Sequence, residues 1–543
     1  MVRTRRGFHV LTLVTALLAI LIAGSCQKRA AQHPKLIVLI AIDGLRADAL
    51  DRYDSAFTGG FRRLRDTGFR FDNAWVDHAI TVSHAGHVTL ATGAYPSHHG
   101  IVDAAFYVPV GRDRKLVDAV EDTTTTIPGF PTLTGASPRN VLRDGICEWT
   151  IHADPEARTL SVGSGNISSL LYAFHTPADV YWYRGGQYVT SSYYRAAVPP
   201  WVAAFNDSVL PAMIDSSRRW ECRVPTPLRS LARPDSANYE GDRTHTTFPH
   251  LVTRELGDGL RKDERATLAR WFGWTPTLDE ATLLLARRGV EAMSLGQRNA
   301  TDCLTIVLSM VDSNSHYYGP MSLEVFDTLV RLDAALGAFF TDLDEKVGAG
   351  NYTVALSADH GFPEVPAYRR QIGLPGRVLT ADEIENVMNE IGADSTRSTG
   401  LDSRARRVAD ILRRRDFVAA VYTPDQLSGT GDADAYLRLY RNSYRKDRVP
   451  RLPLFSLNTA ESEIGRAGVM VRLTEGTMID IDASTHGSPY DYDRHVPLVF
   501  MGAGVPHGAS SAAARTIDVA PTLAALADVR APEDVDGVVL PMK

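Results

Sequence analysis

The sequence predicts an α/β fold, in which helices flank a mainly parallel core sheet and inserted segments form a cap over one edge. Three observations support this: short apolar runs, an amphipathic segment between two of them, and carboxylates or histidines where the runs end. The 543 residues are 44% hydrophobic and 22% charged, which is typical of a globular protein. A net charge of -6 argues against a nucleic-acid duplex as the main partner.

Four apolar runs have the length and composition of strands that are buried on both faces. They are KLIVLIAI (35–42), LTIVLSMV (304–311), YTVALSA (352–358) and VPLVFMG (496–502). Between the second and third runs, apolar residues recur every three or four positions over 322–345, which predicts a helix with one apolar face. A strand–helix–strand crossover is therefore expected there. A final helix is expected to begin near Pro521, because proline suits a first helical turn.

Two long stretches, 104–298 and 363–480, differ from these runs in composition and sequence pattern. The first contains the Pro/Gly-rich segment IPGFPTLTGASP and many aromatic residues. The second contains helical patterns, in one of which Thr380 and Glu383 have the spacing of a capping box. We interpret both as cap insertions within a single catalytic domain that spans residues 34–543.

The N-terminus has the features of an export signal. Arg3, Arg5 and Arg6 precede an apolar segment that is short for a membrane span. The segment ends in AGSC, which resembles a bacterial lipobox and predicts a signal peptide over 1–25 with lipidation of Cys26. Plain secretion and an uncleaved anchor are the alternatives. We expect the protein in the periplasm or at the outer membrane, where Cys147, Cys222 and Cys303 could form one disulfide, with the pair left open.

Six side chains of metal-ligand type follow or precede the predicted strands: Asp43, Asp312, His316, Asp359, His360 and His486. Ligands of open α/β sheets bind beyond the carboxyl ends of the strands, so these residues are expected to meet at one rim. Three carboxylates packed together would repel one another unless cations neutralised them. Mixed Asp/His ligation without Cys favours zinc, with manganese or iron as weaker options.

The stretch ITVSHAGHVTLATGAYPSHHGIV (80–102) contains a candidate nucleophile, Ser83. No Gly-x-Ser-x-Gly elbow surrounds this serine, so an ordinary hydrolase triad is not indicated. The structural alternative for Ser83 is a helix N-cap, and Thr81 is the second candidate nucleophile. We expect His87 to support the helix, and His84, His98 and His99 not to be ligands.

Asp-x-x-x-His-x-x-Gly-Pro, Asp-His-Gly and Thr-His-Gly-Ser, in this order, resemble the motifs of the alkaline phosphatase superfamily. The resemblance is closest to monomeric bacterial alkaline phosphatases and nucleotide pyrophosphatase/phosphodiesterases. It implies an alkaline-phosphatase-like doubly wound core, a monomer, two Zn²⁺ ions and a small-molecule phosphate ester substrate. Asp312, His316 and His486 would hold one zinc, and Asp43, Asp359, His360 and Ser83 the other. Ser83 would attack phosphorus and form a phosphoserine.

The sequence departs from this resemblance where the monoesterases grip the phosphate. They carry an Asn downstream of the nucleophile and then a Lys-x-Arg pair. The matching positions here are Ala104 and Gly165-Asn166-Ile167, with Asn166 the one polar side chain. A monoester dianion needs such cations more than a diester does, so we predict a phosphodiesterase. Alkaline phosphatase activity on monoesters, with Asn166 or a cap residue such as Arg184 as donor, is the first alternative. A phosphonate or sulfate ester hydrolase and a non-catalytic surface-binding lipoprotein are others.

Overall fold

The structure is a computed structural model that describes residues 33–111, 113–164, 175, 178–395, 401–431, 434–451, 463–479 and 483–543. The predicted signal peptide 1–25, Cys26 and three predicted substrate contacts, Gly165, Asn166 and Ile167, lie outside the described residues. Among the helices within those ranges, none combines the length and the apolar character needed to cross a bilayer.

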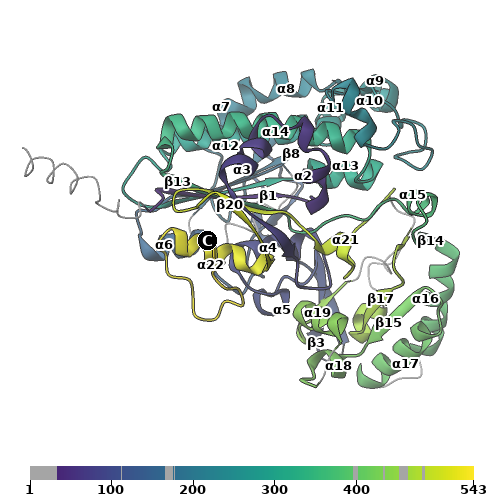
Figure 1. Cartoon of the computed structure of the whole chain (residues 1–543). Helices are drawn as coiled ribbons and strands as arrows, with labels where there is room; N and C mark the ends of the chain where they lie inside the picture. The colour runs from purple at the N-terminus through teal and green to yellow at the C-terminus, as the bar shows by residue number, and fades with distance from the viewer. Residues whose placement is uncertain are drawn as a thin grey trace, which may run out of the picture.

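A nine-stranded mixed sheet forms the centre of the molecule (Figure 1). In spatial order its strands are β20 (Gly508–Arg515), β2 (Phe69–Trp75), β19 (Leu498–Gly502), β13 (Tyr352–Ser357), β1 (Leu36–Ile42), β12 (Asp302–Leu308), β7 (Thr159–Gly163), β8 (Asp179–Arg184) and β9 (Gln187–Val189). β1 lies between β12 and β13 and is parallel to both. The predicted α/β class is confirmed.

The four apolar runs are all strands of this sheet, but the last of them has the opposite direction. β19 is antiparallel to both of its neighbours, β13 and β2. A strand that is buried on both faces is a continuous apolar run in either direction, so its sequence does not reveal its orientation. The expectation that this run is parallel is wrong, and its reversal matters for the site.

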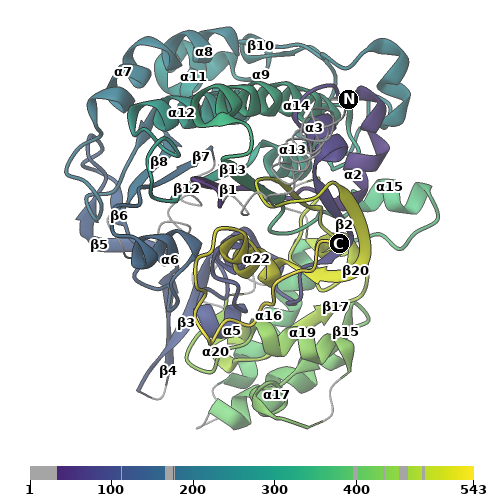
Figure 2. The same ribbon diagram turned by 60° about the vertical axis from the view of Figure 1, so that its left-hand side comes forward.

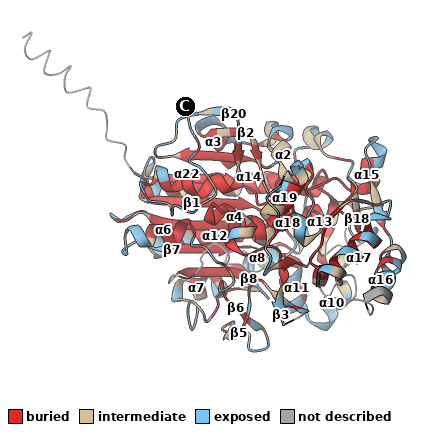
Figure 3. Cartoon of the chain, turned by 90° about the horizontal axis from the view of Figure 1, so that it is seen from below, coloured by how far each residue is buried: buried red, intermediate tan, exposed pale blue. Residues whose placement is uncertain are grey.

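Side chains of β1 alternate between two hydrophobic cores, one on each face of the sheet. Leu36, Val38 and Ile40 join one core, while Ile37 and Leu39 join the other. The first core is covered by α3 (Gly60–Thr67), α12 (Thr277–Ala292) and α14 (Leu323–Leu343), and the second by α4 (Ser83–Thr92), α6 (Ile146–Ala153) and α22 (Val519–Leu526). Figure 2 shows α12 and α14 on one side of the sheet and α6 and α22 on the other. Figure 3 shows that the strands between these layers are buried.

The helices predicted from periodicity and capping are present. α14 occupies the crossover between β12 and β13, and Pro521 is the third residue of α22. α16 (Ala381–Ser395) follows Thr380, whose backbone N–H donates to Glu383 Oε2 at 2.9 Å. The Glu383 N–H donates in turn to Thr380 Oγ1 at 3.3 Å, which completes the predicted capping box.

The two stretches interpreted as cap insertions differ from each other. Residues 363–480 contribute most of a separate core, with Val408, Leu412, Leu439 and Tyr440 among its buried members. This lobe lies beside the sheet at the lower right of Figure 1. The stretch 104–298, by contrast, supplies β7, β8 and β9 to the central sheet, and α6 and α12 to its two faces. It is not an insertion outside the core, and β7, β8 and β9 are short and lack the long apolar runs that mark the other strands.

A disulfide joins Cys147 in α6 to Cys303 in β12, with the two Cα atoms 5.3 Å apart. Both residues are buried, and 156 positions separate them in sequence. Cys222 is a free, half-buried thiol. The bond therefore ties a helix of the 104–298 stretch to a central strand.

Candidate active site

The carboxyl ends of β1, β12 and β13 lie level with one another, because Ile42 pairs with Leu308 and Ala41 with Ser357. Asp43 and Asp359 follow their strands closely, and Asp312 lies in the first turn of α13 (Met310–Tyr318) behind β12. Because β19 is antiparallel, the segment before it, which carries His486, reaches the same edge. The antiparallel direction of β19 therefore places His486, which precedes this strand, at the same rim as the other predicted ligands.

All six predicted ligand-type residues meet there in one cluster. His360 Nε2 lies 3.3 Å from Asp43 Oδ1 and 3.4 Å from Asp359 Oδ2. His316 Nε2 and His486 Nε2 lie 3.6 Å and 3.5 Å from Asp312 Oδ1. The imidazoles of His360 and His486 stack with their centroids 3.6 Å apart.

Each of the three histidines is oriented by a backbone carbonyl. Nδ1 of His316 lies 3.0 Å from the Ser484 oxygen, and Nδ1 of His486 lies 2.8 Å from the Thr81 oxygen. Nδ1 of His360 lies 2.9 Å from the Gly361 oxygen. A carbonyl only accepts, so each Nδ1 carries a proton and each Nε2 faces the carboxylates. With Nδ1 held in this way, Nε2 is the nitrogen that is available to a metal ion.

The carboxylates have the features of a cation site. Asp43 Oδ1, Asp312 Oδ1 and Asp359 Oδ2 are buried and accept no hydrogen bond within the described part of the chain. Burial, followed by the nearby Asp43 charge, raises the pKa of Asp312 to about 6 and that of Asp359 to about 7. Clustered acids that are buried without donors carry a large free-energy cost unless cations bind them. The residues present therefore fit divalent metal ions, and the Asp/His donor set fits zinc.

His87 completes the charge balance on the other side of two carboxylates. Its buried Nε2 lies 3.5 Å from Asp43 Oδ2 and 3.4 Å from Asp359 Oδ2. Burial opposes a charge on His87, but Asp359 and Asp43 outweigh it and raise its pKa. The sequence placed His87 one helical turn after Ser83, and that spacing was the only signal for its position.

Ser83 is the first residue of α4, and Val82 is its N-cap, so the capping alternative for Ser83 is wrong. Its Oγ lies 3.3 Å from His360 Nε2, at the edge of the carboxylate cluster. Thr81 is committed elsewhere, because its hydroxyl donates to the Ser488 carbonyl at 2.9 Å. Gly86 permits the close approach of α4, since a Cβ there would lie 2.3 Å from the Asp359 carbonyl oxygen. No sequence pattern had indicated this role for Gly86.

The chain matches the model of a known protein family. The model of the type I phosphodiesterase / nucleotide pyrophosphatase family matches residues 37–450, which include the carboxylate cluster except His486. The chain belongs to this family. As a type I phosphodiesterase / nucleotide pyrophosphatase family member, it is a phosphate ester hydrolase of the alkaline phosphatase superfamily.

Relatives of this family member include named alkaline phosphatases. Alkaline phosphatase PafA of Elizabethkingia meningoseptica is 28% identical over 549 residues, which cover 95% of each chain. The PafA crystal structure matches with a TM-score of 0.82 over 94% of this chain and 99% of that one. Alkaline phosphatase PhoV of Synechococcus elongatus is 28% identical over 94% of this chain and 92% of its own.

A solved variant of PafA matches the fold equally well. In it a Thr is replaced by Ser, and an Asn, a Lys and an Arg are each replaced by Ala. Its TM-score is 0.82 at 28% identity, over 94% of this chain and 99% of that one.

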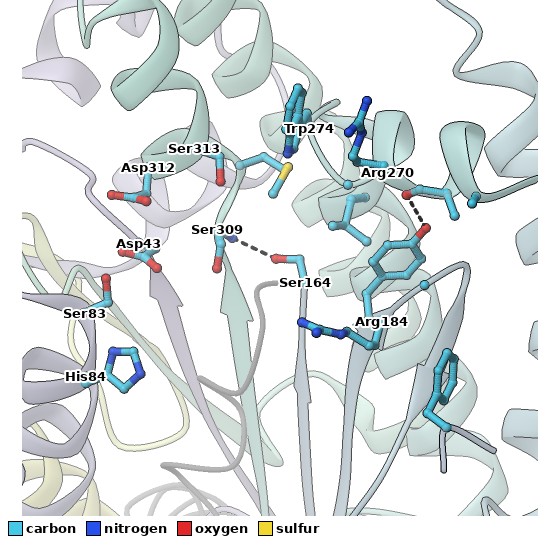
Figure 4. Close-up of a pocket in the computed structure, with 18 residues that line it drawn as sticks. Asp43, Ser83, His84, Ser164, Arg184, Arg270, Trp274, Ser309, Asp312 and Ser313 are labelled. Atoms are coloured by element: carbon cyan, nitrogen blue, oxygen red, sulfur yellow. Dashed lines mark hydrogen bonds between the residues drawn. The ribbon is translucent and has the colours of Figure 1, made fainter. Parts of the chain in front are cut away.

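A pocket of about 790 Å³ opens beside Ser83 and the carboxylates (Figure 4). Arg184, at the end of β8, extends into it toward the side of Ser83, and Arg270 and Trp274 lie at its far wall. His84 also lines the pocket. Arg270 and Trp274 were not anticipated from the sequence, because they come from α11 (Glu264–Phe272) and the turn after it, within an apparent insertion.

The predicted substrate contacts are only partly placed. Ala104 directly precedes β3 (Ala105–Val110) and is not among the described residues that line the pocket. Gly165, Asn166 and Ile167 follow Ser164, a residue of the pocket wall, and lie outside the described residues. Their contact with substrate stays a prediction.

Proposed function

We propose that this protein is an exported, zinc-dependent phosphodiesterase that works through a phosphoserine on Ser83. The observation that carries the proposal is the position of Ser83, whose Oγ lies at the edge of a buried Asp/His cluster and opens into a large pocket. The wider activity, phosphate ester hydrolysis, follows from the family. The metal, the nucleophile and the preference for diesters are the proposed parts.

We assign the cluster to two zinc ions as the resemblance implies, although the ligand atoms that lie closest together are those of Asp312, His360 and His486 and those of Asp43, His87 and Asp359. Asp43, Asp359, His360 and Ser83 would hold one ion, and Asp312, His316 and His486 the other. When bound, zinc would lower the pKa of the serine hydroxyl and neutralise charge on the departing oxygen.

The chemistry of the chain itself consists of two displacements. Ser83 Oγ attacks phosphorus, the Oγ–P bond forms, and the bond from phosphorus to the leaving alcohol breaks on the opposite side. The alcohol oxygen takes up a proton. A water molecule then attacks the phosphoserine, which regenerates the Ser83 hydroxyl and releases the remaining phosphate ester.

The preference for diesters is supported by the missing phosphate grip. In PafA the substituted Thr and Asn stand 21 positions apart, as Ser83 and Ala104 do in this chain. This chain thus naturally carries Ser and Ala where the solved variant carries them by substitution. When an amide and two cations are absent, a phosphomonoester dianion loses more binding free energy than a diester monoanion does.

The pocket has room for the second ester group of a diester. Its volume of about 790 Å³ is in the range of small-molecule sites. Phe130, Tyr183, Leu278 and Met310 give its wall an apolar character beyond Ser83. An alkyl, aryl or nucleoside group could be buried there.

Monoester hydrolysis is the second candidate, and two arginines favour it. The guanidinium groups of Arg184 and Arg270 line the pocket, and neither forms an ion pair with any residue in the described ranges. Either could supply the positive charge that a dianion needs. The names of PafA and PhoV also favour this candidate.

The test compares kcat/KM of the zinc-loaded protein on an aryl phosphate monoester and on the matching methyl aryl diester. We expect the diester to be preferred by at least about tenfold, equivalent to ~1.4 kcal/mol of transition-state stabilisation. The variant Arg184→Ala should leave this preference unchanged. A preference for the monoester that collapses in Arg184→Ala would show instead that the arginine has replaced the missing grip and that the protein is an alkaline phosphatase.

Export and anchoring at Cys26 complete the proposal. They are supported by the basic and apolar N-terminal segment and by the cysteine of AGSC. Growth with a labelled fatty acid should mark the wild-type chain and leave Cys26→Ala unmarked. Equal labelling of both chains would refute lipidation at this residue.

A further inference from the structure

Helix α4 presents two polar side chains to the pocket beside the carboxylate cluster. Every residue from 85 to 92 is buried, whereas Ser83 and His84, the first two residues of the helix, are partly exposed. Both line the pocket of about 790 Å³. Because the rest of the helix is packed against the core, these two residues are held in place together at the pocket wall.

The imidazole of His84 is free to bind a ligand. Within the described ranges, no residue forms a hydrogen bond or an ion pair with it. An imidazole carries at least one N–H in each of its protonation states, so His84 always offers a donor. Figure 4 shows its ring at the pocket wall next to Ser83.

Three hydroxyls of the same pocket are not free in this way. Ser164 Oγ donates to the Val307 carbonyl at 3.1 Å, and the Tyr183 hydroxyl donates to the Ala269 carbonyl at 2.7 Å. A ligand could use these two only by displacing a backbone acceptor. The Oγ of Ser309 is buried, so it does not reach a ligand in the pocket.

Two further donors approach the cluster from other sides. Ser313 follows Asp312 and lies on the side of the cluster away from Ser83, as Figure 4 shows. Arg184 extends from β8, across the pocket from α4. His84 is therefore the side-chain donor that lies on the same helical turn as the candidate nucleophile.

The position of this donor suits one part of a phosphate ester. During attack by Ser83 Oγ, the attacking and leaving oxygens lie in line, and the nonbridging oxygens lie around that line. A donor on the residue next to the nucleophile approaches phosphorus from the side of the line, where a nonbridging oxygen lies. Hydrogen bonds to such anionic oxygens are about twice as strong as those between neutral groups. Ala104 provides no side-chain donor for this oxygen.

We propose that His84 donates a hydrogen bond to one nonbridging oxygen of the phosphate ester and thereby replaces the amide that is missing at Ala104. The inference rests on the proposed chemistry of Ser83 and adds a residue that determines specificity. His84 keeps its proton throughout, because it binds an oxygen whose bond to phosphorus neither forms nor breaks. Since the donor lies on one side, the site distinguishes the two nonbridging oxygens of a diester.

The first test measures kcat/KM on a methyl aryl phosphodiester with the zinc-loaded full chain. His84→Phe keeps a ring and removes the donor, so kcat/KM should fall at least about tenfold. An amide replaces the Nδ1 donor in His84→Asn and the Nε2 donor in His84→Gln, so one of these variants should recover to within about threefold of wild type. His507→Phe, at an exposed position between β19 and β20, is the matched control and should equal wild type.

The melting temperatures of all variants should lie within a few degrees of wild type, because the His84 side chain is partly exposed. Equal losses of kcat/KM in the Phe, Asn and Gln variants would show that the shape of the residue matters and not its donor. That result, or a loss below about twofold in His84→Phe, would overturn the inference.

A phosphorothioate diester tests which oxygen is bound. Replacing one nonbridging oxygen of the methyl aryl diester by sulfur makes phosphorus chiral, and sulfur accepts hydrogen bonds poorly. The ratio of kcat/KM between the two enantiomers should change by about threefold or more in His84→Phe and should stay the same in His507→Phe. An identical ratio in wild type and both variants would mean that His84 does not contact a nonbridging oxygen.

Binding of inorganic phosphate separates this inference from the proposed activity. Calorimetry on zinc-loaded Ser83→Ala, which cannot form a phosphoserine, should give a Kd that rises about fivefold or more when His84→Phe is added. If wild type hydrolyses no diester but phosphate binding still depends on His84, the phosphodiesterase proposal fails and the His84 contact stands. If the diester is hydrolysed and the His84 variants behave like wild type in both assays, the His84 contact fails and the phosphodiesterase stands.

Discussion

At the scale of single residues, Ser83 carries the most specific prediction. Substitution Ser83→Ala should lower kcat/KM by at least about a thousandfold, because no other hydroxyl of the described residues forms a hydrogen bond with His360. The melting temperature should stay within a few degrees of wild type, and zinc content measured by atomic absorption should stay near two per chain. Ser97→Ala, in the next helix, is the control. Retention of most activity in Ser83→Ala would refute the assignment of the nucleophile.

His250 gives a pH-dependent contribution to stability. Burial alone would lower its pKa, but hydrogen bonds to Glu255 and Glu324 raise it to about 9. A raised histidine pKa stabilises the fold fully below the unfolded value near 6.5, and this stabilisation is lost as pH rises through about 9.

The measurement for His250 is the melting temperature of wild type and His250→Gln between pH 6 and pH 10. The melting temperature of wild type should exceed that of His250→Gln by most at pH 6. By pH 10 this difference should have shrunk by the equivalent of roughly 2 kcal/mol in the free energy of unfolding. A gap that is independent of pH would mean that His250 is not charged in the folded protein.

Most of the candidate site could be predicted from the sequence, because ligand-type residues at strand ends follow from topology. Asp43, Asp312, Asp359 and His360 were identified in this way, and the structure brings them together. The groups that orient the histidines could not be predicted, since the Ser484, Thr81 and Gly361 acceptors are backbone carbonyls that any residue provides.

At the scale of elements, helix α4 packs closely against the end of β13 because Gly86 has no side chain. Substitution Gly86→Ala would place a methyl group 2.3 Å from the Asp359 carbonyl oxygen, so the helix and Ser83 must move away. We expect a loss of about 1–3 kcal/mol in stability and a fall of more than about tenfold in kcat/KM.

Thermal unfolding and steady-state kinetics check this prediction, with Gly392→Ala as the control. Gly392 lies within α16, and in the described part of the chain no atom outside the backbone of its own helix lies within 4 Å of the position its Cβ would take. That substitution should be neutral or stabilising by up to about 1 kcal/mol. Equal effects of the two substitutions would show that the contact with Asp359 does not matter.

The elements could be predicted where apolar residues recur with a clear period. They could not be predicted where the sequence has no such pattern. α14 has an apolar stripe along its length, and the sequence identified it within two residues at either end. The direction of β19 and the membership of β7, β8 and β9 in the sheet depend on partners that are distant in sequence. Such pairings leave no local pattern in strands that are buried on both faces.

At the scale of the whole molecule, the Cys147–Cys303 disulfide restricts the conformations that the unfolded chain can adopt. It closes a loop of 156 residues between α6 and β12, so its loss should cost about 2–4 kcal/mol. The double variant Cys147→Ala/Cys303→Ala should melt several degrees lower than wild type, and reductant should lower wild type by a similar amount. Cys222→Ala should melt like wild type, and equal melting of all three proteins would refute a structural role for the bond.

The position of β2 between β19 and β20 has a consequence for the order of folding. β2 is made early in synthesis, yet both of its neighbours come from the last fifty residues of the chain. Until they emerge, Phe69 and Phe71 have no sheet to join, and the nascent chain carries an unpaired apolar strand. His486, too, precedes β19 only slightly. A ribosome must therefore finish almost the entire polypeptide before any molecule can acquire activity, and prematurely terminated chains are candidates for chaperones and proteases.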